Sequence, residues 1–305
     1  MYEPKRASNE PKLMLGHIPH GVDPDLFKKA DSTEEINLMM DIRAKMFQAT
    51  NDDVKFVVLY NSRNIRRKMT GDVILAFQKF VRELPEEERK TVRLILHTQP
   101  RDENGTDLPA IIRDIASDVG QNVVFSHQRV DTLTLNRIYN IADVIINLAS
   151  NEGFGISTLE GMLAEKMTVA NVTGGLQDQM GFRDEKGEYL HEDVHYQTDW
   201  GSNSDGKYKE HGEWANPIWP NNFALNGSIP TPYIFDSRCD WREAAQKLRE
   251  VYDLPKEERA RRGKLAREYA LNGAFNSKEM CRRFMTGFDH VFENWKPRKR
   301  YGIYT

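Results

Sequence analysis

Two carboxylates flank a glycine-rich turn in the middle of the chain. The turn, residues 151–155, reads Asn-Glu-Gly-Phe-Gly and continues into a helical pattern that contains Ser157, Thr158 and Glu160. Its glycines let a ligand approach the backbone closely, and the first turn of a helix offers unpaired amides of positive potential. A carboxylate accepts two hydroxyl hydrogen bonds at once, so Glu152 and Glu160 suit opposite ends of one extended ligand bearing a pyrophosphate and sugar hydroxyls. On spacing alone, a simple chain turn followed by a surface glutamate is an equally good interpretation.

The apolar pattern predicts the elements that position this turn. From Val54 onward, short apolar or β-branched runs alternate with helical segments, which is typical of a parallel sheet covered by helices. The expected strands are Val54 to Tyr60, Val92 to His97, Asn122 to Ser126, Asp143 to Leu148 and Met167 to Val172. The expected crossover helices are Gly71 to Leu84, Leu108 to Val119, Thr134 to Ala142 and Phe154 to Lys166. The predicted fold class is α/β, with a Rossmann-like parallel sheet flanked by helices, and the two-carboxylate turn falls at a strand end, where such sheets bind ligands.

The two ends of the chain have weaker patterns. Residues 1–30 are expected to form a disordered tail and a hinge-like linker, because they are polar and then rich in His, Gly, Pro and Asp. Residues 31–305 are expected to form one domain that opens with a helix at 32–49. Within it, 180–236 is an irregular insertion that hides a strand or two, and helices resume across 240–295.

Composition excludes several classes of protein. The formal net charge is −3, from 43 basic and 46 acidic residues, so no overall field favours nucleic acid or an anionic membrane. Cys239 and Cys281 show neither metal-ligand nor redox spacing, which suits a reducing compartment. There is no apolar run long enough to cross a bilayer and no secretory signal pattern at the N-terminus. We therefore expect a cytoplasmic protein without a membrane span or a nucleic-acid partner.

The glycine-rich turn resembles the signature of the large retaining GT-B glycosyltransferase family, the family 4-like glycosyl transferases group 1, which includes glycogen and sucrose-phosphate synthases. That signature is a glutamate, Gly-Phe-Gly and a second glutamate eight positions after the first, and residues 152–160 match it in full. The resemblance implies that Glu152 contacts the donor sugar and that Glu160 holds the ribose hydroxyls. It also implies that the amides of Gly153, Phe154 and Gly155 meet the sugar and phosphates, and we expect Thr158 in the same donor site.

The segment after the first expected strand resembles a second part of the family pattern. Family members place an arginine here and a lysine five positions later, both on the donor diphosphate, and Arg63 and Lys68 have that spacing. Such cations would stabilise charge on the leaving diphosphate, as a metal ion does in other transferases. The sequence departs from the pattern after the lysine, where the usual glycine is Met69. A plain basic loop is the alternative. No metal is expected, because an Asp-x-Asp spacing occurs only at Asp23 and Asp25 in the linker.

Further resemblances concern the nucleobase and the rest of the enzyme. The loop 127–130 follows a strand where relatives often bind the base through backbone groups, so Gln128 and Val130 are expected there, with a plain connection equally open. GT-B enzymes have two Rossmann-like domains, and only about 16 residues precede the hinge-like motif here. This chain is therefore expected to be the C-terminal, donor-binding half: a fragment, half of a split enzyme or a single-domain relative. A separate N-terminal acceptor domain is then the expected partner.

The function implied by the resemblance is transfer of a sugar from a nucleoside diphosphate sugar with retained anomeric configuration. Glu152, Arg63 and Lys68 are the expected catalytic residues, with no cofactor beyond the donor. Two alternatives stay open: a non-catalytic nucleotide-sugar-binding module, and a GT-B sugar-nucleotide epimerase, which the glutamate spacing disfavours. A dehydrogenase is excluded because no Gly-x-Gly-x-x-Gly turn follows the first expected strand.

Overall fold

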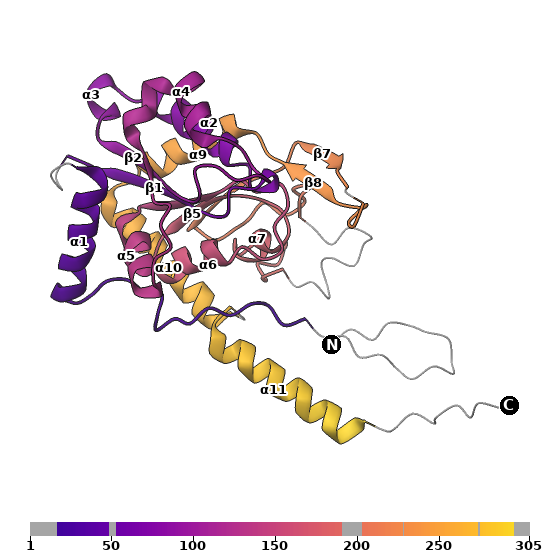
Figure 1. Cartoon of the computed structure of the whole chain (residues 1–305). Helices are drawn as coiled ribbons and strands as arrows, with labels where there is room; N and C mark the ends of the chain where they lie inside the picture. The colour runs from indigo at the N-terminus through magenta and orange to yellow at the C-terminus, as the bar shows by residue number, and fades with distance from the viewer. Residues whose placement is uncertain (1–16, 49–52, 191–202, 228, 274, 296–305) are drawn as a thin grey trace.

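A six-stranded parallel sheet forms the centre of the chain (Figure 1). The computed structural model describes residues 17–48, 53–190, 203–227, 229–273 and 275–295. The strands are β1 (Phe56–Asn61), β2 (Val92–His97), β3 (Val123–Phe125), β4 (Val144–Asn147), β5 (Met167–Asn171) and β6 (Ala215–Ile218). Their order is β3-β2-β1-β4-β5-β6, with every neighbouring pair parallel. The predicted Rossmann-like α/β fold is confirmed. Strands β2 and β3 are added on one side of β1 and strands β4 to β6 on the other, and such folds bind ligands at the point between β1 and β4 where this order changes.

Helices cover both faces of this sheet (Figure 1). They are α1 (Thr33–Phe47), α2 (Thr70–Arg82), α3 (Glu86–Arg89), α4 (Leu108–Asp114), α5 (Thr132–Ile141), α6 (Ile156–Leu163), α7 (Gly175–Asp178), α9 (Trp241–Asp253), α10 (Lys256–Asn272) and α11 (Ser277–Asn294). Two short 3-10 helices, η1 (Arg66–Lys68) and η2 (Ser117–Asn122), lie in the loops. Helices α2, α4 and α9 lie on one face, and α1, α5, α6 and α10 lie on the other.

Alternation along the strands divides the buried side chains into two cores. In β1, Val57 and Leu59 pack into the core that α5, α6 and α10 cover, whereas Phe56, Val58 and Tyr60 pack into the core under α2 and α9. All five side chains are at most 1% exposed. A strand buried on both faces reads as a continuous apolar run, and this is why the sequence predicts a parallel sheet.

Most helix bounds differ slightly from the expected ones for local reasons. The Asp131 side chain accepts a hydrogen bond from the Thr134 amide, so α5 begins at Thr132 rather than Thr134. The helix expected at Leu108 to Val119 is wrong in its second half: α4 ends at Asp114 and η2 follows. The helix expected from Phe154 begins at Ile156, because Gly155 has a φ of +91°.

The linker-like segment packs on the domain. Val22 and Phe27 are 8% and 6% exposed and belong to the core beneath α5 and α6. Val22 forms a parallel bridge with Asn276, just before α11. Of the tail and linker expected over residues 1–30, residues 1–16 lie outside the described residues, and the described part contributes to the same core as the sheet.

The insertion contains three strands, where a strand or two was expected. The first, β6, extends the main sheet beyond β5, and it was not among the expected core strands. The other two, β7 (Asn222–Leu225) and β8 (Phe235–Arg238), pair antiparallel as a separate two-stranded sheet. Residues 191–202 and 228 of the insertion lie outside the described residues.

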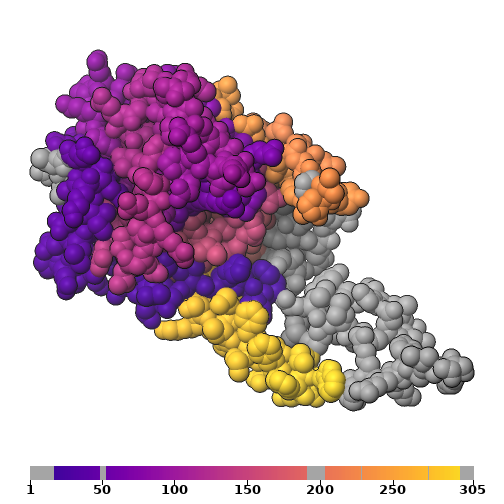
Figure 2. All heavy atoms as spheres, in the orientation of Figure 1, coloured from indigo at the N-terminus to yellow at the C-terminus, as the bar shows by residue number. Residues whose placement is uncertain are grey.

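The three expected C-terminal helices are confirmed as α9, α10 and α11. The last of them, coloured yellow, extends away from the body (Figures 1 and 2), and none of its side chains is buried. Within the described part of the chain, every helix is too short or too polar to span a bilayer.

Candidate functional site

The site forms where the carboxyl ends of β1 and β4 lie side by side. Strand β1 leads into the basic segment that ends at η1, and β4 leads into the glycine-rich turn and α6. Hydrogen bonds join the two loops: the Ser150 amide donates to the Arg67 carbonyl at 2.8 Å, and an Arg67 guanidinium nitrogen donates to the Asn151 carbonyl at 2.7 Å. The sheet order thus brings together segments that are more than 80 residues apart in the chain.

Lys68 and Glu152 form a buried ion pair where the two loops meet, a region called the junction from here on. The Lys68 ammonium donates a hydrogen bond to Glu152 Oε2, and both residues are less than 10% exposed. The Arg67 guanidinium lies 3.7 Å from Glu152 Oε1. Burial lowers the pKa of Lys68, and the hydrogen bond to Glu152 opposes that shift. Two cations therefore face one carboxylate, which leaves the junction positively charged beside the N-terminus of α6.

Glycines hold the turn against the following loop. Gly174 has a φ of +46°, and a Cβ there would lie 1.8 Å from the Glu152 carbonyl oxygen. A Cβ on Gly155 would lie 2.5 Å from the Leu176 side chain. Gly153 differs, because it is exposed and a Cβ there would meet no atom within 4 Å. The fold requires a small residue at Gly155 and Gly174, whereas Gly153 borders open space in front of the turn.

Glu160 lies apart from these cations and has a tyrosine as its partner. The Tyr139 hydroxyl on α5 donates to Glu160 Oε2 at 2.6 Å, and Asn61 Nδ2 at the end of β1 donates to the Tyr139 oxygen at 2.8 Å. Burial raises the pKa of Glu160 to about 7, although the hydrogen bond from Tyr139 acts in the opposite direction. The two signature glutamates thus have different environments: one is paired with cations, and the other is held by a neutral hydroxyl.

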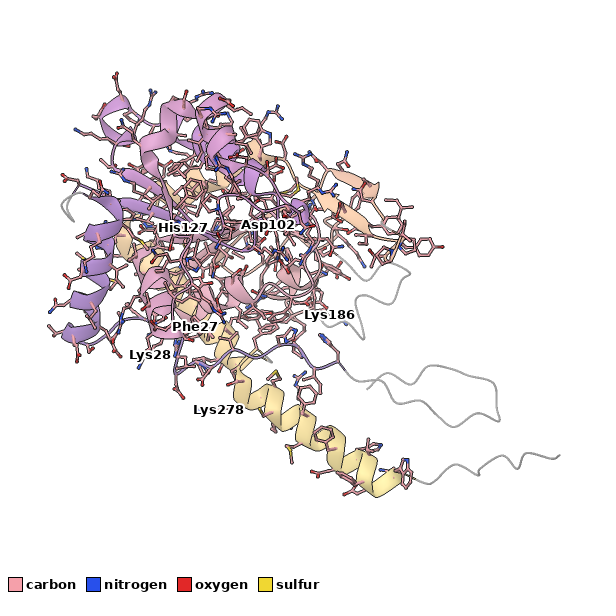
Figure 3. The ribbon with its side chains drawn as sticks, viewed as in Figure 1. Phe27, Lys28, Asp102, His127, Lys186 and Lys278 are labelled. Carbon is pink, nitrogen blue, oxygen red and sulfur yellow. The ribbon has the colours of Figure 1, made fainter. Side chains whose placement is uncertain are left out.

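Arg63 is not brought into contact with Lys68 or Glu152. Its exposed guanidinium pairs with Asp102 on the loop after β2, with Nε to Oδ2 at 2.9 Å and Nη2 to Oδ1 at 3.3 Å. Figure 3 labels Asp102 on this loop, together with His127 on the loop that follows β3. The guanidinium therefore lies on a loop of the site but is engaged by a carboxylate.

The other expected site residues occupy varied positions. Phe154 is 9% exposed and packs against the rings of His20 and Phe275, so the donor site can use only its backbone. Thr158 is 2% exposed, with its hydroxyl 3.4 Å from Asn147 Nδ2. Gln128 is exposed after β3, and Val130 is partly buried against the core. The side chains of Phe154 and Thr158 thus serve packing.

Sequence reasoning missed three residues of the site: Arg67, Tyr139 and Asn61. Arg67 was visible only as one member of the basic run, and the family spacing points to Arg63 and Lys68 instead. Tyr139 lies within an amphipathic helix, and a tyrosine on the apolar face of such a helix is normally interpreted as a core residue. Asn61 had a usable signal, since it is a polar residue at the carboxyl end of a buried strand.

Other features of the described residues lie outside this site. A cavity of about 720 Å³ lies between the insertion and α10, and its lining includes Tyr189, Trp214 and Tyr269 but neither signature glutamate. Across the described ranges, no group of three or more His, Cys, Asp or Glu side chains is arranged to hold a metal ion.

Comparison with known families gives a match over the part of the chain that contains this site. Residues 41–187, which include β1 to β5 and both loops of the junction, match the family described as "Glycosyl transferases group 1". Over these residues the chain is similar to glycosyl transferases group 1. The resemblance of the glycine-rich turn to group 1 glycosyltransferases is confirmed over these residues, and the members of that family are sugar transferases.

A curated relative of this chain is trehalose synthase from Thermococcus litoralis. The two are 25% identical over 172 residues, which are 56% of this chain and 40% of the relative. The chain thus spans about two-fifths of the length of that relative.

Solved glycosyltransferases share the fold. Sucrose-phosphate synthase from Thermosynechococcus elongatus matches with a TM-score of 0.59 and 18% identity, over 90% of this chain and 52% of its own. HepE from Anabaena, solved with UDP and glucose, matches with a TM-score of 0.59 and 17% identity, over 90% and 56%. The C-terminal domain of a group 1 family protein from Francisella tularensis matches with a TM-score of 0.52 and 14% identity, over 84% and 99%. These similarities establish a fold shared with GT-B glycosyltransferases.

Proposed function

We propose that this chain is the donor-binding half of a retaining glycosyltransferase that transfers a sugar from a nucleoside diphosphate sugar. One observation carries the proposal: Lys68, Arg67 and Glu152 meet between the carboxyl ends of β1 and β4, directly before the N-terminus of α6. At this point the order in which strands are added to the sheet reverses. Cations and free helix amides bind phosphates, and a carboxylate between them binds hydroxyls. A nucleoside diphosphate sugar carries both phosphates and hydroxyls.

Each side chain then has a chemical task. Lys68 stabilises the negative charge that develops on the diphosphate when the sugar departs, and Arg67 adds a second positive charge beside it. Glu152 accepts hydrogen bonds from the donor sugar, and Glu160 accepts them from the ribose. With retention, the acceptor hydroxyl attacks on the face from which the diphosphate leaves, so the departing phosphate oxygen can take the acceptor proton.

In this proposal Arg63 leaves Asp102 and binds the diphosphate when the donor binds. In its pair with Asp102 the arginine side chain is 62% accessible and the aspartate side chain 12%, and ion pairs open to solvent on one side add little to stability. A bidentate hydrogen bond from arginine to phosphate is stronger than such a pair, so donor binding can recruit the guanidinium at little cost. With three cations available, we propose that the reaction needs no divalent metal, and EDTA should leave donor affinity unchanged.

The nucleobase is proposed to lie along the loop after β3, against the backbone of Gln128 and Val130. UDP is the first candidate, because HepE, which shares this fold, has been solved with UDP and glucose. The exposed position of Gln128 leaves room for a planar ring there.

A second domain is proposed to supply the acceptor site. The chain covers 99% of the Francisella C-terminal domain but about half of the full-length neighbours. Helix α11 carries apolar side chains that the described part of the domain does not cover: Phe284, Met285, Phe288, Val291 and Phe292, which are 46–82% exposed. An apolar stripe of this size suits a protein interface, and the acceptor domain is the occupant we propose.

A thermal-shift screen tests the proposal. UDP, GDP, ADP and their glucose conjugates are added to the chain, and at least one nucleotide should raise the melting temperature in proportion to its occupancy. Transfer is then assayed with the acceptor domain present, and proton NMR of the product should show the donor's anomeric configuration. Nucleotide binding without any transfer would favour the binding module, an epimerised donor without acceptor would favour the epimerase, and no binding at all would overturn all three.

A further inference from the structure

We propose that Tyr139 and Asn61 are positioning residues for Glu160: together they orient its carboxylate toward the ribose of a bound donor. The proposal rests on the donor-binding role of Glu160 given above and adds the residues that control it. It begins from a chain of two hydrogen bonds, from Asn61 Nδ2 to the Tyr139 oxygen at 2.8 Å and from the Tyr139 hydroxyl to Glu160 Oε2 at 2.6 Å.

The direction of each hydrogen bond is fixed by chemistry. An amide nitrogen can only donate, so the Tyr139 oxygen accepts from Asn61 and its one proton points to Glu160. A tyrosine proton directed in this way favours the carboxylate form of the glutamate as its acceptor. Glu160 Oε2 thereby has its donor, and Oε1, which accepts no hydrogen bond from the described residues, is left to accept a hydroxyl proton.

Packing holds the tyrosine in place. Tyr139 is 0% exposed, and the ring of Phe27 from the linker-like segment meets it edge-on at 5.9 Å between centroids. Figure 3 labels Phe27 beside the helices on this face of the sheet. A buried ring with a single hydroxyl direction is a rigid support, so Glu160 is oriented before any ligand arrives.

The protonation state of the Glu160 carboxyl makes its interaction with a donor depend on pH. Burial raises the pKa of Glu160 to about 7, and the hydrogen bond from Tyr139 keeps it from rising further. Tyr139 is the one titratable group that acts on this pKa among the described residues, while Asn61 supplies a neutral contact from β1. Above pH 7 the carboxylate accepts ribose hydroxyls, and below pH 7 it carries a proton and accepts them poorly. Loss of the Tyr139 hydroxyl raises this pKa, so the midpoint moves upward.

The test measures donor affinity against pH by calorimetry, from pH 5.5 to 9, on wild type and Tyr139→Phe. The probe is whichever of UDP-glucose, GDP-glucose and ADP-glucose binds wild type most tightly. A sugar conjugate is required because the terminal phosphate of a free diphosphate itself titrates near pH 6. We expect Tyr139→Phe to bind about 10-fold more weakly at pH 7, with a midpoint about one pH unit higher and a smaller defect at pH 9.

Control variants separate this inference from the proposed function. Tyr252→Phe removes a matched hydroxyl, which donates to Glu88 at 2.8 Å on the other face of the sheet, and should leave the profile unchanged. Asn61→Ala, which keeps the tyrosine ring, should shift the midpoint in the same direction as Tyr139→Phe. Glu160→Gln should bind weakly with a flat profile. If Glu160→Gln matches wild type, the donor role of Glu160 fails; if it does not, but Tyr139→Phe and Asn61→Ala follow the wild-type profile, only the positioning role is overturned.

Discussion

The two signature glutamates show how much of the chemistry is decided at single residues. Glu152 is paired with Lys68 and lies near Arg67, whereas Glu160 is partly buried and, among the ionisable groups of the described residues, contacts the Tyr139 hydroxyl. Their spacing in the sequence predicts the pair but not this difference. The partners lie 84 positions from Glu152 and 21 positions from Glu160, and only the fold brings them together. The same holds for Arg63, whose partner Asp102 lies 39 positions away.

The environment of Glu160 predicts a cost in stability. Its pKa is raised from 4.5 to about 7 in the folded chain, so between these values the folded state binds a proton that the unfolded state has lost. Stability from this group is therefore lost as pH rises from about 4.5 to about 7. We expect Glu160→Gln to unfold at higher denaturant than wild type at pH 8, by up to about 3 kcal/mol, with little difference at pH 4.

Urea titrations at the two pH values measure this difference. The exposed Glu103→Gln is the matched control, because it removes one carboxylate without changing a buried contact. A gain for Glu160→Gln at pH 8 combined with weaker nucleotide binding would mark the carboxylate as kept for function at the expense of stability. Equal stability of wild type and Glu160→Gln at both pH values would show that burial does not disfavour the charged form.

At the scale of elements, the turn from β4 into α6 was predictable because its determinants are local. An apolar strand, two glycines and an amphipathic helix follow one another without interruption, and the observed β4 and α6 lie within the expected ranges. The sixth strand was not predictable. β6 has four residues, includes Pro217 and lies at the edge of the sheet, where one neighbour suffices. Its pairing with β5 is set by the sheet and not by its own pattern.

Two glycines of the site are expected to respond differently to the same substitution. Gly174→Ala places a Cβ against the Glu152 carbonyl at a positive φ, so it should lower the free energy of unfolding by about 2 kcal/mol or more. Gly153→Ala fills open space, so stability should change by less than about 1 kcal/mol. Its methyl group should nevertheless block the close approach of a diphosphate and weaken binding about 10-fold or more.

Thermal melts and nucleotide calorimetry on both glycine variants check these expectations. Gly153→Ala serves as the stability control for Gly174→Ala, because the same atoms are added in the same loop cluster. Wild-type nucleotide affinity in Gly153→Ala would mean that the ligand does not approach this part of the turn.

Over the whole molecule, the sheet, its two covered faces and the C-terminal helices follow from the period of the apolar residues. The relation to a second domain could not be read from that pattern. The proposed acceptor domain is supported instead by the share of longer relatives that the chain covers and by α11, which extends from the body (Figure 2) and has exposed apolar side chains. Phe284, Phe288 and Phe292 lie four residues apart and therefore share one face of this helix.

This stripe predicts the behaviour of the isolated chain. Changing Phe284, Phe288 and Phe292 together to serine removes exposed apolar area but no buried contact of the described domain. We expect each substitution to change stability by less than about 0.5 kcal/mol, and the triple variant to scatter less light at high concentration than wild type. Phe77→Ser, on the buried face of α2, is the contrasting variant and should unfold the domain. A large loss of stability in the triple variant would show that α11 is part of the core.

The most direct test of the donor site is calorimetric titration of the best-binding nucleoside diphosphate into wild type, Arg63→Ala and Glu160→Gln at pH 8. Arg63 is exposed, and its partner Asp102 still accepts a hydrogen bond from the Asn104 amide, so removal of the guanidinium should leave the fold intact. Both variants should bind more weakly by about 1–3 kcal/mol, the range for a lost charged hydrogen bond, with one nucleotide per chain in wild type. Affinities equal to wild type in both variants would contradict the assignment of this junction as the nucleotide-sugar site.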